Sequence, residues 1–227
     1  MPENNLAVLP KILAGPIVRR ANAQQVCFWL VTKQAYDFSV KLFDGQQTWF
    51  DDQLSEQQLF QVQIGTYAFV NLITLEPNSD IARGSRVSYD IGLIEADGNV
   101  SHLPDLIPSL LYENQFHPNF VIRKQIGNML HGSCRKPHHD RGDGLVIVDE
   151  QIASAVTGQS EAPDLLMMSG DQVYVDDVAG PTLLAIEQTI NKLGLFQETL
   201  EGATISNSRD IFSNPLCFYR RPELLPD

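Results

Sequence analysis

Two short runs of residues in the C-terminal half decide how this chain folds. Residues 129–135 read MLHGSCR, and residues 164–177 read DLLMMSGDQVYVDD. The second run is apolar up to Gly170 and Asp171, which is typical of a buried parallel strand that presents a carboxylate at its end. Ligands of open α/β sheets bind at the carboxyl ends of the strands. The runs therefore predict two parallel strands, ending at Cys134 and Asp171, that form the opening half of a metal site.

Helical patterns flank these strands. One helix is predicted between them, because four apolar residues share one helical face: Leu145, Val148, Ile152 and Val156. A second helix is predicted to begin at Pro181 and to end before Gly194. Its inward side chains are expected to be Leu183, Ile186, Ile190 and Leu193. The order strand, helix, strand, helix is the start of an α/β sheet, and we assign residues 120–227 to it.

Residues 1–119 are predicted to form an antiparallel β-sandwich of fibronectin III or immunoglobulin type. Short runs separated by turn residues are expected as strands at 26–32, 38–45, 60–65, 67–75 and 86–93. Trp29 and Tyr89 are expected in the core, with ligand stacking by Trp29 as the alternative. Several prolines among residues 101–120 indicate an ordered linker without regular elements, which places the domain boundary near Asn119.

The composition excludes several classes of partner. The chain has 227 residues and a formal net charge of −12, which disfavours binding to nucleic acid or to an anionic membrane. Three cysteines without a regular spacing favour a reducing compartment over a disulfide framework. The N-terminus lacks the pattern of a signal peptide, and no apolar run is long enough to span a membrane. We therefore expect a cytoplasmic protein.

Each residue near the two strand ends can be given an expected role, or two alternative roles, from its chemistry. Asp171 is expected to bind a metal ion, because a carboxylate after Gly at the end of an apolar strand is a hard oxygen donor. Cys134 is either a buried structural thiol or a thiolate ligand of a soft ion. Arg135 is either a surface residue or a contact for a phosphate oxygen. His131 is expected as a core or sheet histidine. Ser133 and Cys134 are rejected as nucleophiles, because neither stands in a nucleophile elbow or a phosphate-cradling loop.

Further polar residues lie near these strand ends in the sequence. The loop 136–144 contains adjacent histidines and two aspartates: His138, His139, Asp140 and Asp143. Because adjacent histidines on a loop point apart, we interpret this loop as solvated or as a contact for substrate phosphate. Asp176 and Asp177 either bind a hard cation or cap the helix that begins at Pro181.

The two runs also resemble a known family. HGSCRKPHHDRGDGL (131–145) and PDLLMMSGDQVYVDD (163–177) are similar to the metallophosphatase domain of the alkaline phosphatase D (PhoD-like) family, within the calcineurin-like phosphoesterase superfamily. GDQVYVDD is the more specific match. GPIVRR (15–20) and VCFWL (26–30) resemble the β-rich N-terminal domain of the same family.

The resemblance implies a metal-dependent phosphoesterase that hydrolyses small phosphate mono- or diesters with a metal-activated water. It implies that Asp171 bridges two metal ions and that Cys134 and Tyr174 are further ligands. Asp177 completes the expected metal set, and the expected ions are iron plus calcium or another divalent ion. Asp171 and Arg135 are the expected catalytic residues.

The chain departs from this family downstream. It contains no Asn-His pair, although the family supplies an Asn-His-Asp/Glu block and further ligands after the second strand. Two strands are also few for a doubly wound sheet. We therefore expect the N-terminal portion of a longer enzyme, catalytically incomplete by itself, with the missing C-terminal half as a partner. The alternatives are a non-catalytic β-sandwich binding module with an inert α/β remnant, and a structural protein whose sheet a second polypeptide completes.

Overall fold

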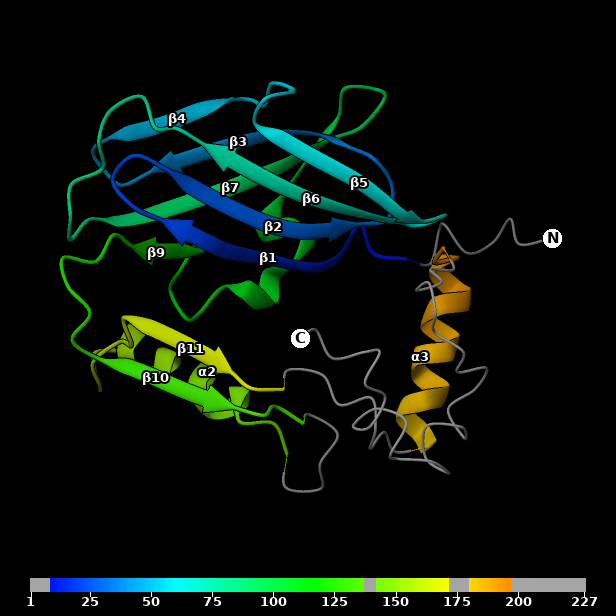
Figure 1. Ribbon diagram of the computed structural model, residues 1–227. Coiled ribbons are helices and arrows are strands. Elements are labelled where there is room, and N and C mark those ends of the chain that lie inside the picture. Colours follow the sequence, from blue (N-terminus) through cyan, green and yellow to red (C-terminus); the bar gives the residue numbers. More distant parts are fainter. Residues whose placement is uncertain (1–8, 137–141, 172–179, 197–227) are drawn as a thin grey trace, which may run out of the picture.

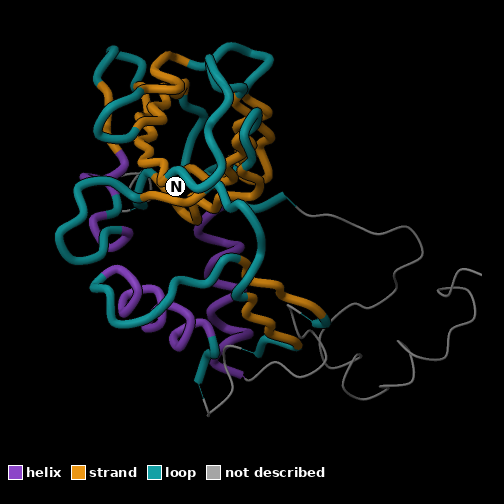
Figure 2. Tube along the Cα trace, turned by 90° about the vertical axis from the view of Figure 1, so that its left-hand side faces the viewer, coloured by secondary structure: helices purple, strands orange, loops and turns teal. Residues whose placement is uncertain are grey.

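The computed structural model describes residues 9–136, 142–171 and 180–196, and Figure 1 shows their arrangement. Antiparallel strands of the N-terminal part form two sheets, and a parallel pair of strands with a helix lies beside them. Figure 2 shows the same chain turned by 90°, with the strands of the sandwich gathered in two layers. The prediction of an antiparallel β-sandwich is confirmed at this level.

The first sheet has four strands in the order β1-β2-β6-β5, and all neighbours are antiparallel. Their bounds are β1 Ile12–Ala21, β2 Val26–Thr32, β5 Leu59–Gly65 and β6 Ala68–Leu75. The second sheet has five strands in the order β4-β3-β7-β8, with β9 also paired to β7. Their bounds are β3 Asp37–Phe43, β4 Thr48–Gln53, β7 Arg86–Ile94, β8 Val100–His102 and β9 Asn119–Val121. The five predicted strands are all present, whereas β1, β4, β8 and β9 were not predicted.

Alternating side chains from both sheets form the core. In β2, Val26, Phe28 and Leu30 are fully buried. The ring centroids of Phe28 and Tyr89 lie 4.8 Å apart, so the prediction that Tyr89 belongs to the core is confirmed. The same prediction for Trp29 is wrong. Trp29 follows Phe28 in the strand, points to the opposite face of the sheet and is only half-buried.

The two fully buried polar residues of the described sandwich, Thr32 and Asn71, are hydrogen-bonded. The Asn71 side-chain amide donates to Thr32 Oγ1 (3.0 Å) and to the Phe69 carbonyl (2.9 Å). Its own oxygen accepts from Gln61 Nε2 at 2.7 Å. Because both sides of the amide have partners, burying Asn71 does not leave an unsatisfied polar group between the sheets.

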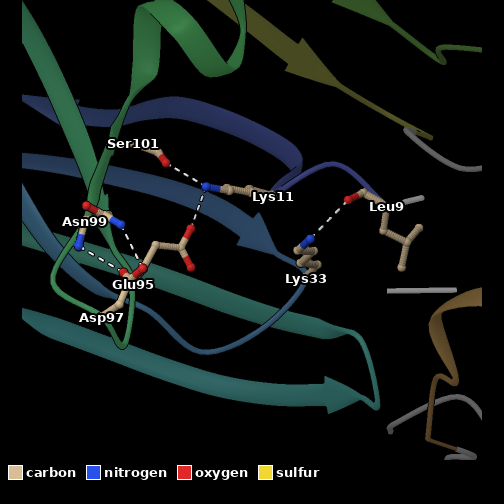
Figure 3. A network of polar contacts seen from close by, with 7 residues as sticks. All are labelled: Leu9, Lys11, Lys33, Glu95, Asp97, Asn99 and Ser101. Carbon is tan, nitrogen blue, oxygen red and sulfur yellow. Dashed lines mark hydrogen bonds and ion pairs between the residues drawn. The ribbon is translucent and has the colours of Figure 1, made fainter. Parts of the chain in front are cut away.

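A polar network joins residues 9–11, just before β1, to the hairpin of β7 and β8 (Figure 3). Lys11 Nζ lies 2.5 Å from Glu95 Oε1 and donates to Ser101 Oγ at 2.6 Å. Lys33 Nζ donates to the Leu9 carbonyl at 3.4 Å. The Lys11 contacts reach from the first sheet to the second, and the Lys33 contact holds the residues before β1 against the end of β2.

The segment 101–120 contains regular elements, so the expectation of a linker without them is wrong. It includes helix α1 (Leu103–Leu106) and the short helix η1 (Pro108–Leu110), each with Pro in its first turn, where the missing N–H is tolerated. Leu103 is fully buried in the core. Strand β9 pairs with β7, and Ile122 after it is buried too. The domain boundary near Asn119 stays a prediction.

A strand–helix–strand unit follows the sandwich, in the predicted order. It consists of β10 (Met129–Ser133), α2 (Leu145–Val156) and β11 (Leu165–Ser169). The strands are parallel, with Met129 opposite Leu165 and Ser133 opposite Ser169. The predicted burial of the second strand is wrong, because Leu165, Leu166 and Met167 are 38–50% exposed. The four residues of the predicted α2 face are half-buried, as expected.

Helix α3 (Gly180–Leu193) lies apart from the parallel strands (Figure 1). Gly194 ends it with φ of 57°, and hydrogen bonds from Gly194 to Asn191 and from Leu195 to Ile190 form a Schellman motif. Ile186 and Ile190 are 46% and 43% exposed, so the expectation that they point inward is wrong. In the described ranges, no helix combines the length and apolar character needed to cross a membrane.

Polar contacts tie the sandwich to the strand–helix–strand unit. Arg123 Nη1 lies 3.0 Å from Asp164 Oδ1, and the other carboxylate oxygen accepts from the backbone amides of Asn128 and Gly127. These amides, and the Arg123 charge to a smaller extent, hold the pKa of Asp164 below its usual range. The Tyr112 hydroxyl donates to the Asp149 carboxylate of α2 at 2.6 Å.

Candidate functional site

The carboxyl ends of β10 and β11 lie side by side. Ser133 is paired with Ser169, and the Cys134 amide donates to the Ser169 carbonyl at 3.1 Å. Cys134 and Gly170 follow the paired serines, and both have positive φ angles, 58° and 67°. The structure therefore brings Cys134 and the Gly170-Asp171 dipeptide to one edge, where the sequence predicted them.

Gly170 is the residue that allows this close approach. A Cβ atom at this position would lie 2.8 Å from Cys134 Sγ and 2.8 Å from Ser133 Oγ. No side chain fits at that distance without a displacement of the thiol, and glycine also adopts the positive φ without strain. Cys134 and Asp171 are both exposed, so a thiol and a carboxylate are accessible at the strand ends.

Arg135 is fixed beside the thiol by a bidentate ion pair. Its Nε lies 3.1 Å from Asp143 Oδ1, and its Nη2 lies 2.5 Å from Asp143 Oδ2. This hydrogen bonding raises the pKa of Arg135 and, together with the Leu145 amide, lowers the pKa of Asp143. The sequence analysis assigned Asp143 to a solvated or phosphate-binding loop. In the structure its carboxylate orients Arg135, a role that no spacing in the sequence indicates.

His131 joins the two strands on the exposed side of the sheet. Its Nε2 lies 2.7 Å from Ser169 Oγ, so the sheet interpretation of this histidine is the one that the structure supports. Ser169 was not a candidate in the sequence analysis. The register of the strands alone places it opposite Ser133 and within reach of His131.

A cavity of about 600 Å³ opens between the strands and α2. Its polar end is formed by Ser133, Cys134, Arg135 and Asp143, and its apolar wall includes Leu145, Val148 and Met168. Asp171 is not part of this wall. The cavity can therefore take a ligand that has an apolar group near α2 and a polar group near Cys134.

The donor set at this edge fits a first-row transition metal, since a thiolate and a carboxylate provide one soft and one hard ligand. In the described part of the chain, no three His, Cys, Asp or Glu side chains are grouped so that they could hold a metal ion. The other candidates lie outside the described residues: Tyr174, Asp176, Asp177, His138, His139 and Asp140. Cys134 and Asp171 are the two predicted metal ligands that the structure places.

Comparisons with known proteins assign no family. No protein-family model matches the chain, and no curated protein gives a significant match. The interpretation of the site therefore depends on the geometry of the strand ends and on the resemblance of the two runs that form them.

Proposed function

We propose that the chain is a metal-dependent phosphoesterase similar to alkaline phosphatase D, with its metal centre at the carboxyl edge of β10 and β11. One observation carries the proposal. The parallel register places the Cys134 thiol against Gly170, and Asp171 is the next residue. Cys134 and Asp171 would hold the ions, with Tyr174 and Asp177 as further ligands. Bound iron and calcium would polarise a phosphoryl oxygen and activate a water.

Arg135 is the proposed contact for the phosphate group of the substrate. A guanidinium has five N–H donors, and Asp143 accepts hydrogen bonds from Nε and Nη2. The remaining donors can bind a phosphate oxygen while the ion pair keeps the plane of the guanidinium fixed. Asp143 is thus a positioning residue, and the substrate would be a phosphate mono- or diester.

The proposed function also implies a fold type for the sandwich and for the strand–helix–strand unit. We assign the sandwich to the fibronectin III or immunoglobulin type and the strand–helix–strand unit to the start of an α/β metallophosphatase domain. The strand order supports the first assignment. The two sheets of an immunoglobulin constant domain have the strand orders A-B-E-D and C-F-G. The first sheet here, β1-β2-β6-β5, has the same order as A-B-E-D, and β3-β7-β8 has the same order as C-F-G, with β4 as an added edge strand.

The metal content of the purified chain tests this function. We expect protein produced with added iron and calcium to retain iron, measured by mass spectrometry, and Cys134→Ser and Asp171→Asn each to lower that content about tenfold, as loss of a ligand does. Cys27→Ser is the matched control, because Cys27 is a half-buried thiol of β2 with its Sγ near Thr74. A folded wild type without metal, or equal metal content in all variants, would refute the proposal.

A second function, a protein-binding module, is favoured by the outer face of the first sheet. The register aligns one apolar row across its four strands: Ile17, Trp29, Leu72 and Phe60. Phe60 is 66% exposed, and Val62 and Ile64 extend the exposed surface along β5. Solvent-facing sides of antiparallel sheets are usually polar. An apolar row of this kind marks an interaction surface.

We infer that a second copy of the chain covers this outer face. The outward positions of β2, β5 and β6 carry no charged side chain: Cys27, Trp29, Val31, Phe60, Val62, Ile64, Val70, Leu72 and Thr74. On the edge strand β1, Arg20 lies opposite Cys27 and places one positive charge at the rim of this face. The centre of the face therefore fits an apolar partner surface, and the same face of a second copy provides one in a two-fold arrangement.

Sedimentation equilibrium tests the dimer. We expect concentration-dependent dimerisation of the wild type and at least a tenfold weaker association of Phe60→Lys, because a charge would then be buried in an apolar interface. Gln53→Lys adds the same charge on β4 of the other sheet and should leave the dimer unchanged. A wild type that stays monomeric over the whole concentration range would exclude the second function in this form.

A further inference from the structure

A separate cavity of about 460 Å³ lies between the sandwich and the strand–helix–strand unit. The sandwich side contributes Tyr89, Phe120, Arg86 and Arg123 among others, and the opposite wall includes Ile152, Ala155 and Val156 of α2. The volume is in the range of small-molecule sites, which often lie where two folding units meet. None of these residues belongs to the strand-end site proposed for the metal.

Tyr89 contributes to this cavity a hydroxyl without a hydrogen-bond partner among the described residues. Its ring packs against Phe28 and Phe120, with centroids 4.8 Å and 6.0 Å away, and the residue is only 5% exposed. Burial raises the pKa of Tyr89 to about 12, so the hydroxyl stays protonated at neutral pH. No group of the described residues hydrogen-bonds to this hydroxyl, whereas the Tyr112 hydroxyl beside the same cavity donates to Asp149.

The two arginines of the cavity differ in their partners. Arg123 is paired with Asp164 and also donates to the Pro163 carbonyl. Arg86 donates to the neutral side-chain oxygen of Asn119 at 2.6 Å, and no carboxylate of the described chain pairs with it. Since Arg123 is neutralised and Arg86 is not, the cavity has one positive charge available for an anion.

We propose that this cavity binds a small organic anion with a flat apolar body. The anionic group contacts the Arg86 guanidinium, and a polar atom at the other end of the ligand accepts a hydrogen bond from the Tyr89 hydroxyl. The apolar body lies between the Phe120 ring and the α2 side chains Ile152 and Val156. This binding site is independent of the phosphoesterase reaction and of the dimer face.

Fluorescence titration with 6-hydroxy-2-naphthoate tests the proposal, because this probe has a carboxylate at one end of a flat ring system and a hydroxyl at the other. We expect saturable binding of one molecule per chain. Arg86→Ala should weaken it about tenfold, which corresponds to about 1.4 kcal/mol. Arg19→Ala, an exposed arginine of β1, is the matched control and should change nothing.

The proposed hydrogen bond from Tyr89 is tested separately by comparing two probes that differ only in one hydroxyl. Tyr89→Phe removes a hydroxyl without a protein partner, so the fold should be retained. This variant should weaken binding of 6-hydroxy-2-naphthoate severalfold and leave binding of 2-naphthoate, which lacks the hydroxyl, unchanged. The proposal would be overturned if the wild type showed no saturable binding, or if Arg86→Ala bound the probe as tightly as the wild type. Loss of binding in Phe60→Lys would also overturn it, because the probe would then lie on the outer face of the first sheet.

Discussion

Phe28→Ala is expected to lower the free energy of unfolding by about 3–5 kcal/mol, the usual cost of removing a buried aromatic ring. Phe28 is fully buried, and its ring contacts Tyr89 from the opposite sheet. The substitution leaves a cavity at the centre of the sandwich, where β2 is held on both sides by neighbouring strands and cannot move inward to fill it.

Trp29→Ala is the matched control for this prediction. Trp29 is the larger side chain, yet it lies half-buried on the outer face, so its removal should cost only about 1 kcal/mol. Urea unfolding followed by circular dichroism, at protein concentrations low enough to keep the chain monomeric, measures both variants. A larger loss for Trp29→Ala than for Phe28→Ala would mean that the strand faces the core with its other side.

Gly170→Ala is expected to remove metal binding and to destabilise the strand-end region more than an ordinary substitution of glycine. An alanine at φ of 67° has about 1–2 kcal/mol of backbone strain. The added Cβ would also lie 2.8 Å from Cys134 Sγ, so the thiol must leave the position that it has beside Gly170. Overpacking of this kind costs about a further 1–3 kcal/mol.

Gly158→Ala separates these two effects. Gly158 has a similar φ of 76°, but a Cβ there meets no atom within 4 Å. This variant should therefore show the backbone strain alone and keep its metal. Thermal unfolding and metal analysis of both variants form the comparison. If Gly170→Ala retained as much iron as Gly158→Ala, the close contact between Gly170 and Cys134 would have no part in the metal site.

The sandwich was predictable wherever one face of a strand differed from the other. Residues 38–45 alternate clearly, and β3 forms there with its apolar side chains in the core. The run 26–32 is apolar on both faces, so its pattern identifies a strand but not which side faces inward. The outer face of the first sheet is itself apolar, and this is why the sequence placed Trp29 in the core although it lies on that face.

The missed strands lack an alternating pattern for other reasons. In β4, Trp49 and Phe50 are adjacent and both buried, and two aspartates follow them. In β1, Gly15 and Pro16 interrupt the strand, and its register with β2 shifts at several points. Both are edge strands, where Pro and irregular pairing are tolerated because one side of the strand has no partner in the sheet.

The meeting of Cys134 and Asp171 at one edge of the sheet was predictable, because it follows from two apolar runs that are each close to these residues in the sequence. Two apolar runs that end in Ser-Cys and Ser-Gly-Asp pair in parallel with the serines opposite each other, so the residues after them meet. The Arg135–Asp143 pair and the His131–Ser169 contact depend instead on loop conformation and strand register, which no spacing in the sequence specifies.

The central claim is that Cys134 and Asp171 bind the same metal ion at the carboxyl edge of β10 and β11. X-ray absorption spectroscopy of the zinc-loaded chain measures this most directly, because it detects sulfur in the coordination shell. We predict one sulfur neighbour at about 2.3 Å and oxygen or nitrogen neighbours at about 2.0–2.2 Å. The sulfur signal should vanish in Cys134→Ser and persist in Cys27→Ser. Bound zinc without a sulfur neighbour in the wild type would contradict the claim.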